Sequence, residues 1–319
     1  MRVRSARLRS LAKVNLGLKV LNKRPDGYHE LRTVFQTISL ADTIDIEYSP
    51  ARATSIEIDS TVDIPDNLIV RAAQIVLSHL ATTARVRFRL TKKIPMGGGL
   101  GGGSSNAAAV LLALPVLAGR RIPLDQLIAL AAQLGSDVPF FLLGGRALGL
   151  GRGTELYPLP DNWRGGPALV VTPRTHVSTA NAYSALNRQL TNELPSSILN
   201  SFQSFVWRME DLLSPDFLAG DWTYENDFES AVFLEHPHLG EIKAKLRKLR
   251  AKHASMSGSG SAVFGIFETR EQRDRALRAF GEAYPVSLVS RRAYHSLWWR
   301  QLDKHMDQKT WPPLSRYGE

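Results

Sequence analysis

Six glycines fill seven positions, 97 to 103, of the segment PMGGGLGGGSSNAAAV, and two serines and an asparagine follow them. An ordered glycine is entropically costly, so such a run indicates a place where the backbone must be bare. A glycine loop that enters a helix offers free N–H groups and the positive end of the helix dipole to an anion. The segment therefore predicts a phosphate-binding loop, followed by a helix whose first residues are Ser104, Ser105 and Asn106.

Two familiar phosphate-binding motifs fit this loop poorly. Gly97-x-Gly99-x-x-Gly102 matches the dinucleotide pattern, but that motif also needs an acidic residue about 20 positions on, at the end of the next strand. Here Asp125 opens a predicted helix instead. The glycine spacing of a Walker A loop is present, yet Ser104 stands where that motif has its lysine. A flexible turn that only permits tight helix packing is the remaining alternative, and the length of the run favours the phosphate site.

The composition is that of a globular protein long enough for two domains. The chain has 319 residues, and its hydrophobic and charged fractions, 44% and 22%, are ordinary. It has no cysteine, which excludes disulfides, thiolate metal sites and a cysteine nucleophile. No apolar run approaches the roughly 18 residues of a membrane span, and the arginines of the first ten residues read as a basic strand or tail rather than a targeting peptide. We expect a cytoplasmic protein that binds no membrane.

The net charge of +10 favours anionic partners. The basic residues are scattered, however: Arg85, Arg87 and Arg89 alternate with apolar residues on one strand, and residues 243–253 read as the solvated side of a helix. We therefore expect no nucleic acid. A basic RNA-binding protein is the alternative from another class, and salt-dependent RNA affinity would distinguish it from a protein that binds magnesium-ATP saturably.

The pattern of apolar and polar residues predicts the strands and helices that position the glycine loop. Alternating apolar residues predict antiparallel strands at 14–20, 44–48 and 56–58, and a further strand at 85–90. Helices are expected over 66–79 with Asp66 as the cap, 107–118 with a kink or early end at Pro115, and 123–134. The Pro- and Gly-rich residues 158–167 predict a domain boundary near 160. Beyond it, helices over 179–190, 197–213, 226–234, 239–252 and 270–281 accompany strands over 168–171, 261–267 and 285–291.

Three motifs, in this order along the chain, resemble those of the GHMP kinases. They are AKVNLGLKVLNKRPDGYHEL (12–31), PMGGGLGGGSSNAAA (95–109) and MSGSGSAVFGIF (256–267). The resemblance implies an α+β, two-domain GHMP kinase fold: a ribosomal protein S5 domain 2-like β/α domain over 1–160 and a ferredoxin-like α/β domain over 161–295. Residues 296–319 form an extension with three tryptophans and no clear period, which we expect to pack on the C-terminal domain.

The PDGYHEL motif resembles one branch of these kinases, whose acceptor is a cytidine diphosphate-linked methylerythritol. The resemblance implies ATP-dependent phosphorylation of the acceptor's 2-hydroxyl, in the non-mevalonate route to isoprenoid precursors. Mg²⁺ would be carried by the ATP phosphates without a dedicated protein site, Ser105 being the candidate side-chain ligand. Another GHMP kinase, of the homoserine or mevalonate type, is the alternative, which a substrate panel would distinguish. A monomer or weak homodimer is expected.

The resemblance also gives roles to residues that look ordinary by themselves. Lys13 sits on a strand, where a lysine is usually solvated, and Asp137 follows a helix end, where an Asx turn or cap is common. In the family this lysine lies near the reacting hydroxyl and this aspartate is its general base, so both are expected to be catalytic. Asn15, two positions from Lys13 and so on the same strand face, matches the substrate-binding asparagine.

Further residues match the family's binding positions. Tyr28 is expected to stack on the cytosine ring, His29 to hydrogen-bond its polar edge, and Tyr183 to supply a second aromatic ring. A second tight turn of Gly258, Ser259 and Gly260 is expected to face the first across the cleft. The residues expected to bind ATP are Pro95, Met96, Gly97, Gly98, Gly99, Leu100, Gly101, Gly102, Gly103, Ser104, Ser105 and Asn106, with Asn67, Leu68 and Lys92 near the adenine.

Overall fold

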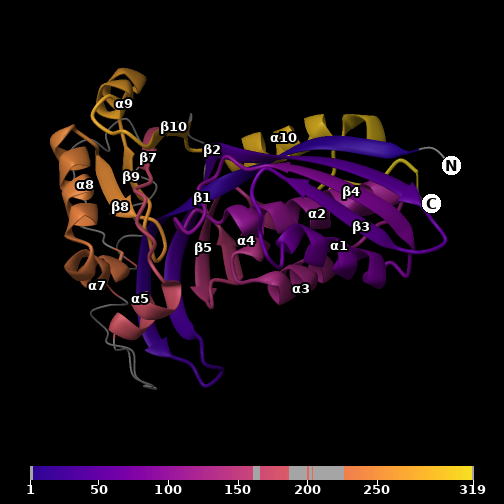
Figure 1. Ribbon diagram of the computed structural model, residues 1–319, viewed down its shortest axis with the longest axis horizontal. Helices are drawn as coiled ribbons and strands as arrows, with labels where there is room; N and C mark the ends of the chain where they lie inside the picture. The colour runs from indigo at the N-terminus through magenta and orange to yellow at the C-terminus, as the bar shows by residue number, and fades with distance from the viewer. Residues whose placement is uncertain (1–2, 161–165, 187–199, 201–202, 204–225, 318–319) are drawn as a thin grey trace.

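The computed structural model describes residues 3–160, 166–186, 200, 203 and 226–317, which form two β-sheets with helices packed on them (Figure 1). The first sheet has six strands in the order β3-β4-β2-β5-β6, with β1 paired to β2. The second sheet has four strands in the order β10-β7-β9-β8. The strands of the first are β1 (Arg4–Lys23), β2 (His29–Pro50), β3 (Ser55–Ser60), β4 (Ala84–Thr91), β5 (Arg146–Gly151) and β6 (Glu155–Pro158). Those of the second are β7 (Pro167–Val171), β8 (His253–Met256), β9 (Val263–Ile266) and β10 (Ala283–Ser287).

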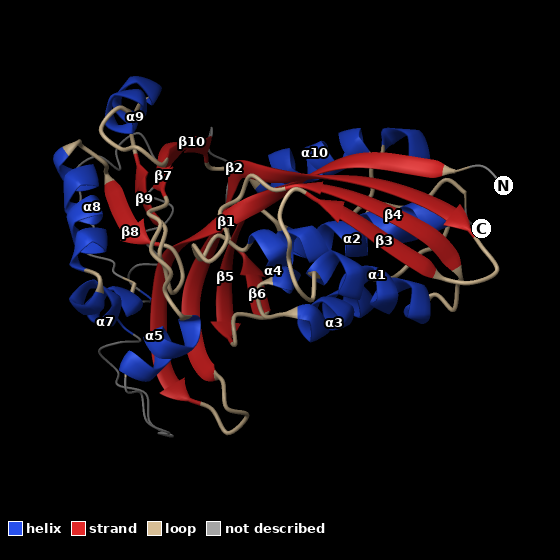
Figure 2. Cartoon of the chain, in the orientation of Figure 1, coloured by secondary structure: helices blue, strands red, loops and turns tan. Residues whose placement is uncertain are grey.

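The helices fall into two groups, one beside each sheet (Figure 2). The N-terminal group packs around the buried helix α2, and consists of α1 (Leu68–His79), α2 (Gly102–Ala118), α3 (Leu124–Leu134) and α4 (Val138–Leu143). The C-terminal group consists of α5 (Thr179–Ala185), α7 (Phe228–Glu235), α8 (Pro237–Lys248) and α9 (Arg270–Leu277). Near the end of the chain, α10 (Arg291–Gln301) and the short 3₁₀ helix η3 (Asp303–His305) run along β1. No helix among the described residues is long and apolar enough to cross a membrane.

The hairpin of β1 and β2 belongs to both halves of the molecule. Its antiparallel pairing runs from Arg4 opposite Tyr48 to Lys23 opposite His29, which confirms the prediction for the first two strands. The expectation of antiparallel pairing is wrong for the strand at 56–58, because β3 pairs with β4 in parallel. The base of the hairpin shares a core with α1 to α4, whereas Leu18, near its tip, packs with the helices and strands of the second sheet. One pair of strands therefore supplies apolar side chains to both cores.

Two helix starts differ from the prediction. Asn67, not Asp66, caps α1: its side chain accepts a hydrogen bond from the Ile69 N–H, while Asp66 lies before the cap with a φ of 49°. Helix α2 begins at Gly102, so the two serines lie inside its first turn rather than at its start. Nor does the internal proline of α2 end it early, because residues 105–117 are all buried and their packing outweighs the roughly 3 kcal/mol that such a proline costs.

The C-terminal extension packs on the N-terminal half, so the expectation that it packs on the C-terminal domain is wrong. Its first part is helical, and Tyr294, Trp298 and Leu302 point into the core shared by α1 to α4. Trp298 is 1% exposed. The predicted boundary near 160 and most of the predicted helix over 197–213 lie outside the described residues.

Buried Asp42 ties the large sheet to the glycine segment. Its carboxylate is fully buried and accepts hydrogen bonds from the Lys92 ammonium at 2.6 Å, from the Asn106 amide at 3.0 Å, and from the N–H groups of Lys93 and Ile94 at 2.8 Å each. These donors come from the end of β4 and from the first turns of α2. One carboxylate therefore fixes both flanks of the glycine segment.

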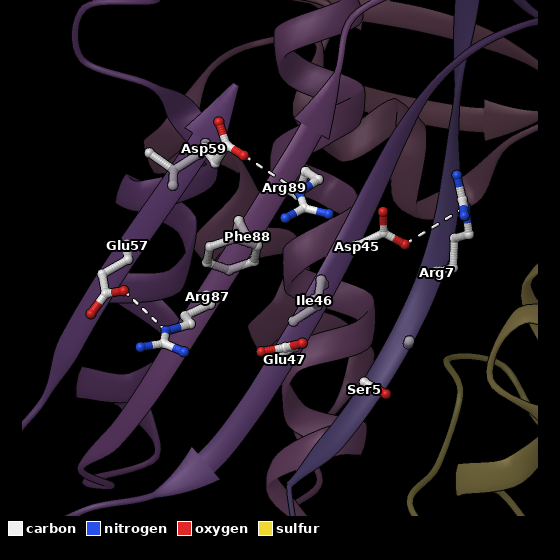
Figure 3. A pocket seen from close by; sticks show the side chains of 12 residues that line it. Ser5, Arg7, Asp45, Ile46, Glu47, Glu57, Asp59, Arg87, Phe88 and Arg89 are labelled. Carbon is white, nitrogen blue, oxygen red and sulfur yellow. Dashed lines mark hydrogen bonds and ion pairs between the residues drawn. The ribbon is translucent and has the colours of Figure 1, made fainter. Parts of the chain in front are cut away.

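We expect Asp42→Asn to lower the free energy of unfolding by about 3 kcal/mol, because it leaves a buried ammonium without its counter-charge. Urea denaturation followed by circular dichroism measures this change. Asp45→Asn on the same strand is the matched control: its partner Arg7 lies on the solvent-exposed face, and such a pair contributes about 1 kcal/mol or less (Figure 3). Equal losses in the two variants would contradict the role given to Asp42.

Candidate active site

A cavity of about 210 Å³ lies where β1 and β2 meet α5 and α7. It brings together residues from all three sequence motifs and from the segment around Asp137. Its walls are formed by Lys13, Asn15, Leu18, Leu31, Thr33, Phe35, Gly99, Asp137, Arg152, Thr179, Tyr183, Phe228, Gly258 and Ser259. Segments far apart in the sequence therefore converge on one hollow, as a site that must orient two molecules requires.

A larger hollow of about 810 Å³ lies on the outer face of the six-stranded sheet and holds none of these residues. Its walls carry neighbouring charges of opposite sign, and the carboxylates of Asp45, Glu57 and Asp59 point toward arginines on adjacent strands (Figure 3). Because these arginines already face carboxylates, the hollow offers little free charge to an anion. This face is a solvated sheet surface.

Lys13 and Asp137 meet at one end of the smaller cavity. The Lys13 Nζ lies 3.3 Å from Asp137 Oδ2 and donates a 2.7 Å hydrogen bond to Asn15 Oδ1. Lys13 is 3% exposed, whereas 35% of the Asp137 side chain is accessible from the cavity side. A buried ammonium needs such partners, because an unpaired one would be costly to bury. The contact also confirms that Lys13 and Asn15 share a strand face.

The strand presents these two side chains because its pairing with β2 is irregular on either side of them. The register shifts between Leu11 and Lys13, and again between Asn15 and Gly17. Such irregularities re-aim side chains and are frequent next to active sites. Asn15 Nδ2 then donates to Thr33 Oγ1 at 2.8 Å, and that hydroxyl donates to the Gly17 carbonyl at 2.7 Å. The chain of hydrogen bonds fixes the Asn15 amide, and through it the lysine.

Asp137 is the N-cap residue of α4, but its side chain makes no capping hydrogen bond. The carboxylate lies against Lys13 instead. The helix behind it is buried, and the Phe140 ring stacks on that of Phe35 with centroids 4.9 Å apart. A carboxylate that its own helix does not use, held on a buried helix, is free to accept a proton in the cavity.

The glycine segment passes directly over the lysine. Gly97, Gly99 and Gly101 have φ values of 71°, 70° and 68°, a conformation that glycine adopts without strain. The Lys13 N–H donates to the carbonyl of the adjoining Leu100 at 3.0 Å. A Cβ at residue 101 would lie 3.1 Å from the Lys13 Cγ and 2.9 Å from a ring carbon of the following helix α4. The bare backbone thus allows the loop and the lysine to touch.

The second Gly/Ser turn is in contact with this loop, so the expectation that it faces the loop across the cleft is wrong. The Ser257 hydroxyl donates to the Gly99 carbonyl at 2.9 Å, and the Ala262 N–H donates to the Gly98 carbonyl at 3.3 Å. Gly258 lies against the same place. Because residue 99 has no side chain, the two turns close onto each other and form one edge of the cavity.

Other residues expected to bind ATP lie beneath the loop. Ser105 is buried and its hydroxyl donates to the Leu11 carbonyl at 2.7 Å, while Asn106 and Lys92 hold the carboxylate of Asp42. These three side chains support the loop from below. The more accessible part of the segment consists of Met96, Gly97 and Gly103, with Pro95 and Ser104 half-buried.

Asn67 and Leu68 lie beside the first turn of α2, at the start of α1. The Asn67 side chain caps α1. Leu68 Cδ1 lies 3.6 Å from the position that a Cβ on Gly103 would occupy. The start of α1 therefore borders the glycine segment, which is the place expected of an adenine contact.

The aromatic residues expected to bind the base lie near one another. The His29 ring stacks on that of Tyr183, with centroids 4.6 Å apart and 20° between the planes. Tyr183 also meets Phe228 edge-on at 4.8 Å. Tyr28 is 49% exposed and lies under the Arg152 guanidinium, 3.6 Å from its ring centroid. The three predicted residues thus share one end of the site without forming a pair of facing tyrosines.

The charge state of this aromatic cluster follows from its burial. Burial, together with the positive charge of Lys23, lowers the pKa of His29 below its usual value. Burial and the negative charge of Asp137 raise the pKa of Tyr183 to about 12. At neutral pH the cluster is therefore uncharged, and a neutral imidazole offers one donor and one acceptor nitrogen.

Comparisons with known proteins show the family of this chain. The model of the GHMP kinases N terminal domain matches residues 67–145, and that of the GHMP kinases C terminal matches residues 216–286. A protein of Solibacter usitatus named 4-diphosphocytidyl-2-C-methyl-D-erythritol kinase is 53% identical over 324 residues, 99% of this chain and 98% of its own. The chain belongs to the GHMP kinase family, in its 4-diphosphocytidyl-2-C-methyl-D-erythritol kinase branch.

Further relatives of this GHMP kinase carry the same name. One from a Synechococcus species is 38% identical over 281 residues, 86% of this chain and 89% of its own. A crystal structure of 4-(cytidine 5'-diphospho)-2C-methyl-D-erythritol kinase is 38% identical with a TM-score of 0.72, covering 88% of this chain and 98% of that chain. A homoserine kinase from Cytophaga hutchinsonii, 19% identical with a TM-score of 0.63 over 89% and 94% of the two chains, shares the fold. The resemblance and the two-domain α+β fold are confirmed.

Several residues of this GHMP kinase site were not singled out from the sequence. Thr33 and Arg152 line the cavity, and Phe228 supports Tyr183. Asn226 donates to the carbonyls of Met256 and Gly258, at 2.9 and 2.6 Å, and so shapes the second turn. Asn226 and Phe228 lie in the sequence NDFE at 226–229, where polar residues surround one aromatic residue. This pattern could have indicated both of them as site residues. Thr33 and Arg152 have no local signal.

We expect Gly99→Ala to lower the free energy of unfolding of the GHMP kinase by at least about 2 kcal/mol. A Cβ at this position would lie 2.0 Å from the Ser257 carbonyl oxygen, and the φ of 70° disfavours any residue with a side chain. Thermal and urea unfolding measure the loss.

Gly103→Ala is the matched control in the same segment. Its Cβ meets only Leu68 Cδ1 at 3.6 Å, and the residue is helical, so alanine should leave stability unchanged or raise it by up to about 1 kcal/mol. Similar losses in both variants would mean that the contact between the two turns is not what makes residue 99 special.

Proposed function

We propose that this small-molecule kinase transfers the γ-phosphoryl group of ATP to the 2-hydroxyl of 4-diphosphocytidyl-2-C-methyl-D-erythritol, in the non-mevalonate route to isoprenoid precursors. The observation that carries the proposal is the Lys13–Asp137 pair, 3.3 Å apart, between the glycine segment and the aromatic cluster. A phosphate donor on one side and a cytidine-bearing acceptor on the other would meet at this pair. The relatives named for this acceptor support the choice of substrate.

In the proposed mechanism the acceptor hydroxyl lies between Asp137 and the γ-phosphate. The hydroxyl oxygen forms a bond to the γ-phosphorus while the bond from that phosphorus to the ADP oxygen breaks, and the hydroxyl proton passes to the Asp137 carboxylate. The Lys13 ammonium stabilises negative charge as it develops on the transferring group. Since Asn15 and Thr33 already fix the lysine, little rearrangement is needed when the substrates bind.

ATP would bind with its phosphates on the backbone of residues 97–103 and at the start of α2, where N–H groups lack partners within the helix. Among the described residues no cluster of three acidic or histidine side chains could hold a metal ion. Magnesium would arrive on the ATP phosphates and would neutralise part of their charge there. The hydroxyl of Ser105, the candidate side-chain ligand of magnesium, donates a hydrogen bond to the Leu11 carbonyl.

The cytidine end of the acceptor would occupy the aromatic cluster. The base would stack on the aromatic rings there, and neutral His29 can both donate to and accept from its polar edge. For the His29–Tyr183 stack to take a base between its rings, the two rings must separate. We further propose that the enzyme works in the cytoplasm as a monomer or weak homodimer, without nucleic acid or membrane.

The proposal is tested by ADP release with magnesium-ATP and 4-diphosphocytidyl-2-C-methyl-D-erythritol, with homoserine and mevalonate assayed in parallel. We expect turnover of the cytidyl substrate alone. Asp137→Asn and Lys13→Ala should each lower kcat by about 100-fold or more while the proteins stay folded, because each removes a group acting on the reacting atoms. Turnover of homoserine or mevalonate instead would reject the acceptor, and full activity in either variant would reject the mechanism.

Tyr183→Ala should raise the KM for the cytidyl acceptor by about 10- to 100-fold, because it removes one stacking surface for the base. The KM for ATP should stay within about twofold, since the phosphates bind elsewhere. Tyr157→Ala, an exposed tyrosine on β6, is the control and should change neither constant. Steady-state kinetics with each substrate varied in turn measure these values. Equal effects on both KM values would argue against a base-binding role.

A further inference from the structure

The last turn of α4 is held by side chains from α10 and from the C-terminal extension. The Tyr294 hydroxyl donates to the Phe141 carbonyl at 2.6 Å, the Trp311 Nε1 donates to the Leu142 carbonyl at 3.0 Å, and the His295 Nε2 lies 3.1 Å from the Leu143 carbonyl. We call these three residues, Tyr294, His295 and Trp311, the aromatic clamp. Its members also support one another, because the His295 ring stacks on that of Trp311 with centroids 3.7 Å apart and 11° between the planes.

The clamp completes the hydrogen bonding of this short helix. The last four carbonyls of a helix have no partner within it, and burying them unpaired is costly. In α4 the Phe140 carbonyl accepts a hydrogen bond from the Gly144 N–H at 2.8 Å. The clamp residues provide hydrogen-bond partners for the other three carbonyls, those of residues 141 to 143. Gly144, which follows the helix, lies directly against the clamp, since a Cβ at this position would lie 2.1 Å from Tyr294 Cδ1. The position of α4 along its own axis therefore depends on the extension.

The other end of the same helix carries Asp137. A helix of six residues is about 9 Å long and moves as one rigid unit, so a shift at its C-terminal end is passed to its N-cap. The body of α4 also contacts the rest of the site, because the Phe141 ring lies against Gly101 next to the Lys13 stem. What fixes the last turn of α4 thus fixes the carboxylate that faces Lys13.

We infer that the aromatic clamp is a set of positioning residues for the general base: it sets the distance from the Asp137 carboxylate to Lys13 and to the acceptor hydroxyl. The inference rests on the proposed function, in which Asp137 takes the proton. The clamp residues are not among those that line the cavity. Their effect should therefore appear in the catalytic step and not in substrate binding.

The test measures kcat and both KM values, well below the unfolding temperature, for Tyr294→Phe, Trp311→Phe and the double variant. Tyr294→Phe removes only a hydroxyl, so it remains informative even if the larger change fails to fold. We expect the double variant to lower kcat by about tenfold, because a sub-ångström displacement of a catalytic group is costly, and to leave both KM values within about twofold.

Trp299→Phe is the matched control within the extension. Its indole Nε1 donates to the Thr310 carbonyl at 2.8 Å, a bond inside the extension that does not involve α4. This variant should lower the unfolding temperature by a similar amount and leave kcat unchanged.

A second background separates positioning from general stability. In Asp137→Asn, assayed at high enzyme concentration, the clamp substitutions should cause no further fall in kcat, because the group they position is already gone. The same fold-reduction in both backgrounds, or unchanged kcat despite lower stability, would overturn the inference while the proposed function stands. No turnover of the cytidyl acceptor by the wild-type protein would instead reject the proposed function, and the inference with it.

Discussion

The site depends on one long antiparallel pair of strands that both halves of the molecule share. Because β1 and β2 pair continuously from one core to the other, the middle of β1 is covered on both sides, and residues 10 to 18 are all buried. A regular strand there would turn alternate side chains toward each layer. Ala12, Val14 and Leu16 follow this alternation into one core, whereas Lys13 and Asn15 point the other way, and the cavity opens there, between the two register shifts.

Burying Lys13 at this point lowers the free energy of unfolding, whereas burying a hydrophobic residue there would not. The contacts of Lys13 with Asp137 and Asn15 offset the cost of desolvation without making the pair a source of stability. What the arrangement provides is a charged group that is already oriented, with the water-accessible carboxylate of Asp137 on the cavity side. The same holds for Asp42 beneath the loop, where a fully buried carboxylate fixes backbone N–H groups rather than a reacting atom.

Much of this site could be predicted from the sequence because its signals are local. The glycine run predicts a loop without side chains before a helix. The two-residue spacing of Lys13 and Asn15 predicts that both lie on one face of a strand. The contact between the two Gly/Ser turns could not be predicted in the same way, since residues 99 and 257 meet only through the tertiary fold. Nor could Asp42 be identified, because its partners Lys92 and Asn106 lie 50 and 64 positions away.

The residues at and after the start of the extension carry a helical signal: Tyr294, Trp298 and Leu302 recur every four residues, which is the spacing of one helix face. The packing of that face has a consequence for synthesis of the chain. The core around α1 to α4 is built from residues 6 to 147 together with residues 294 to 306, so it stays open until residues 294 to 306 have left the ribosome. The first half of this enzyme thus cannot finish folding ahead of the second, and a chain that stops short exposes apolar surface that chaperones recognise.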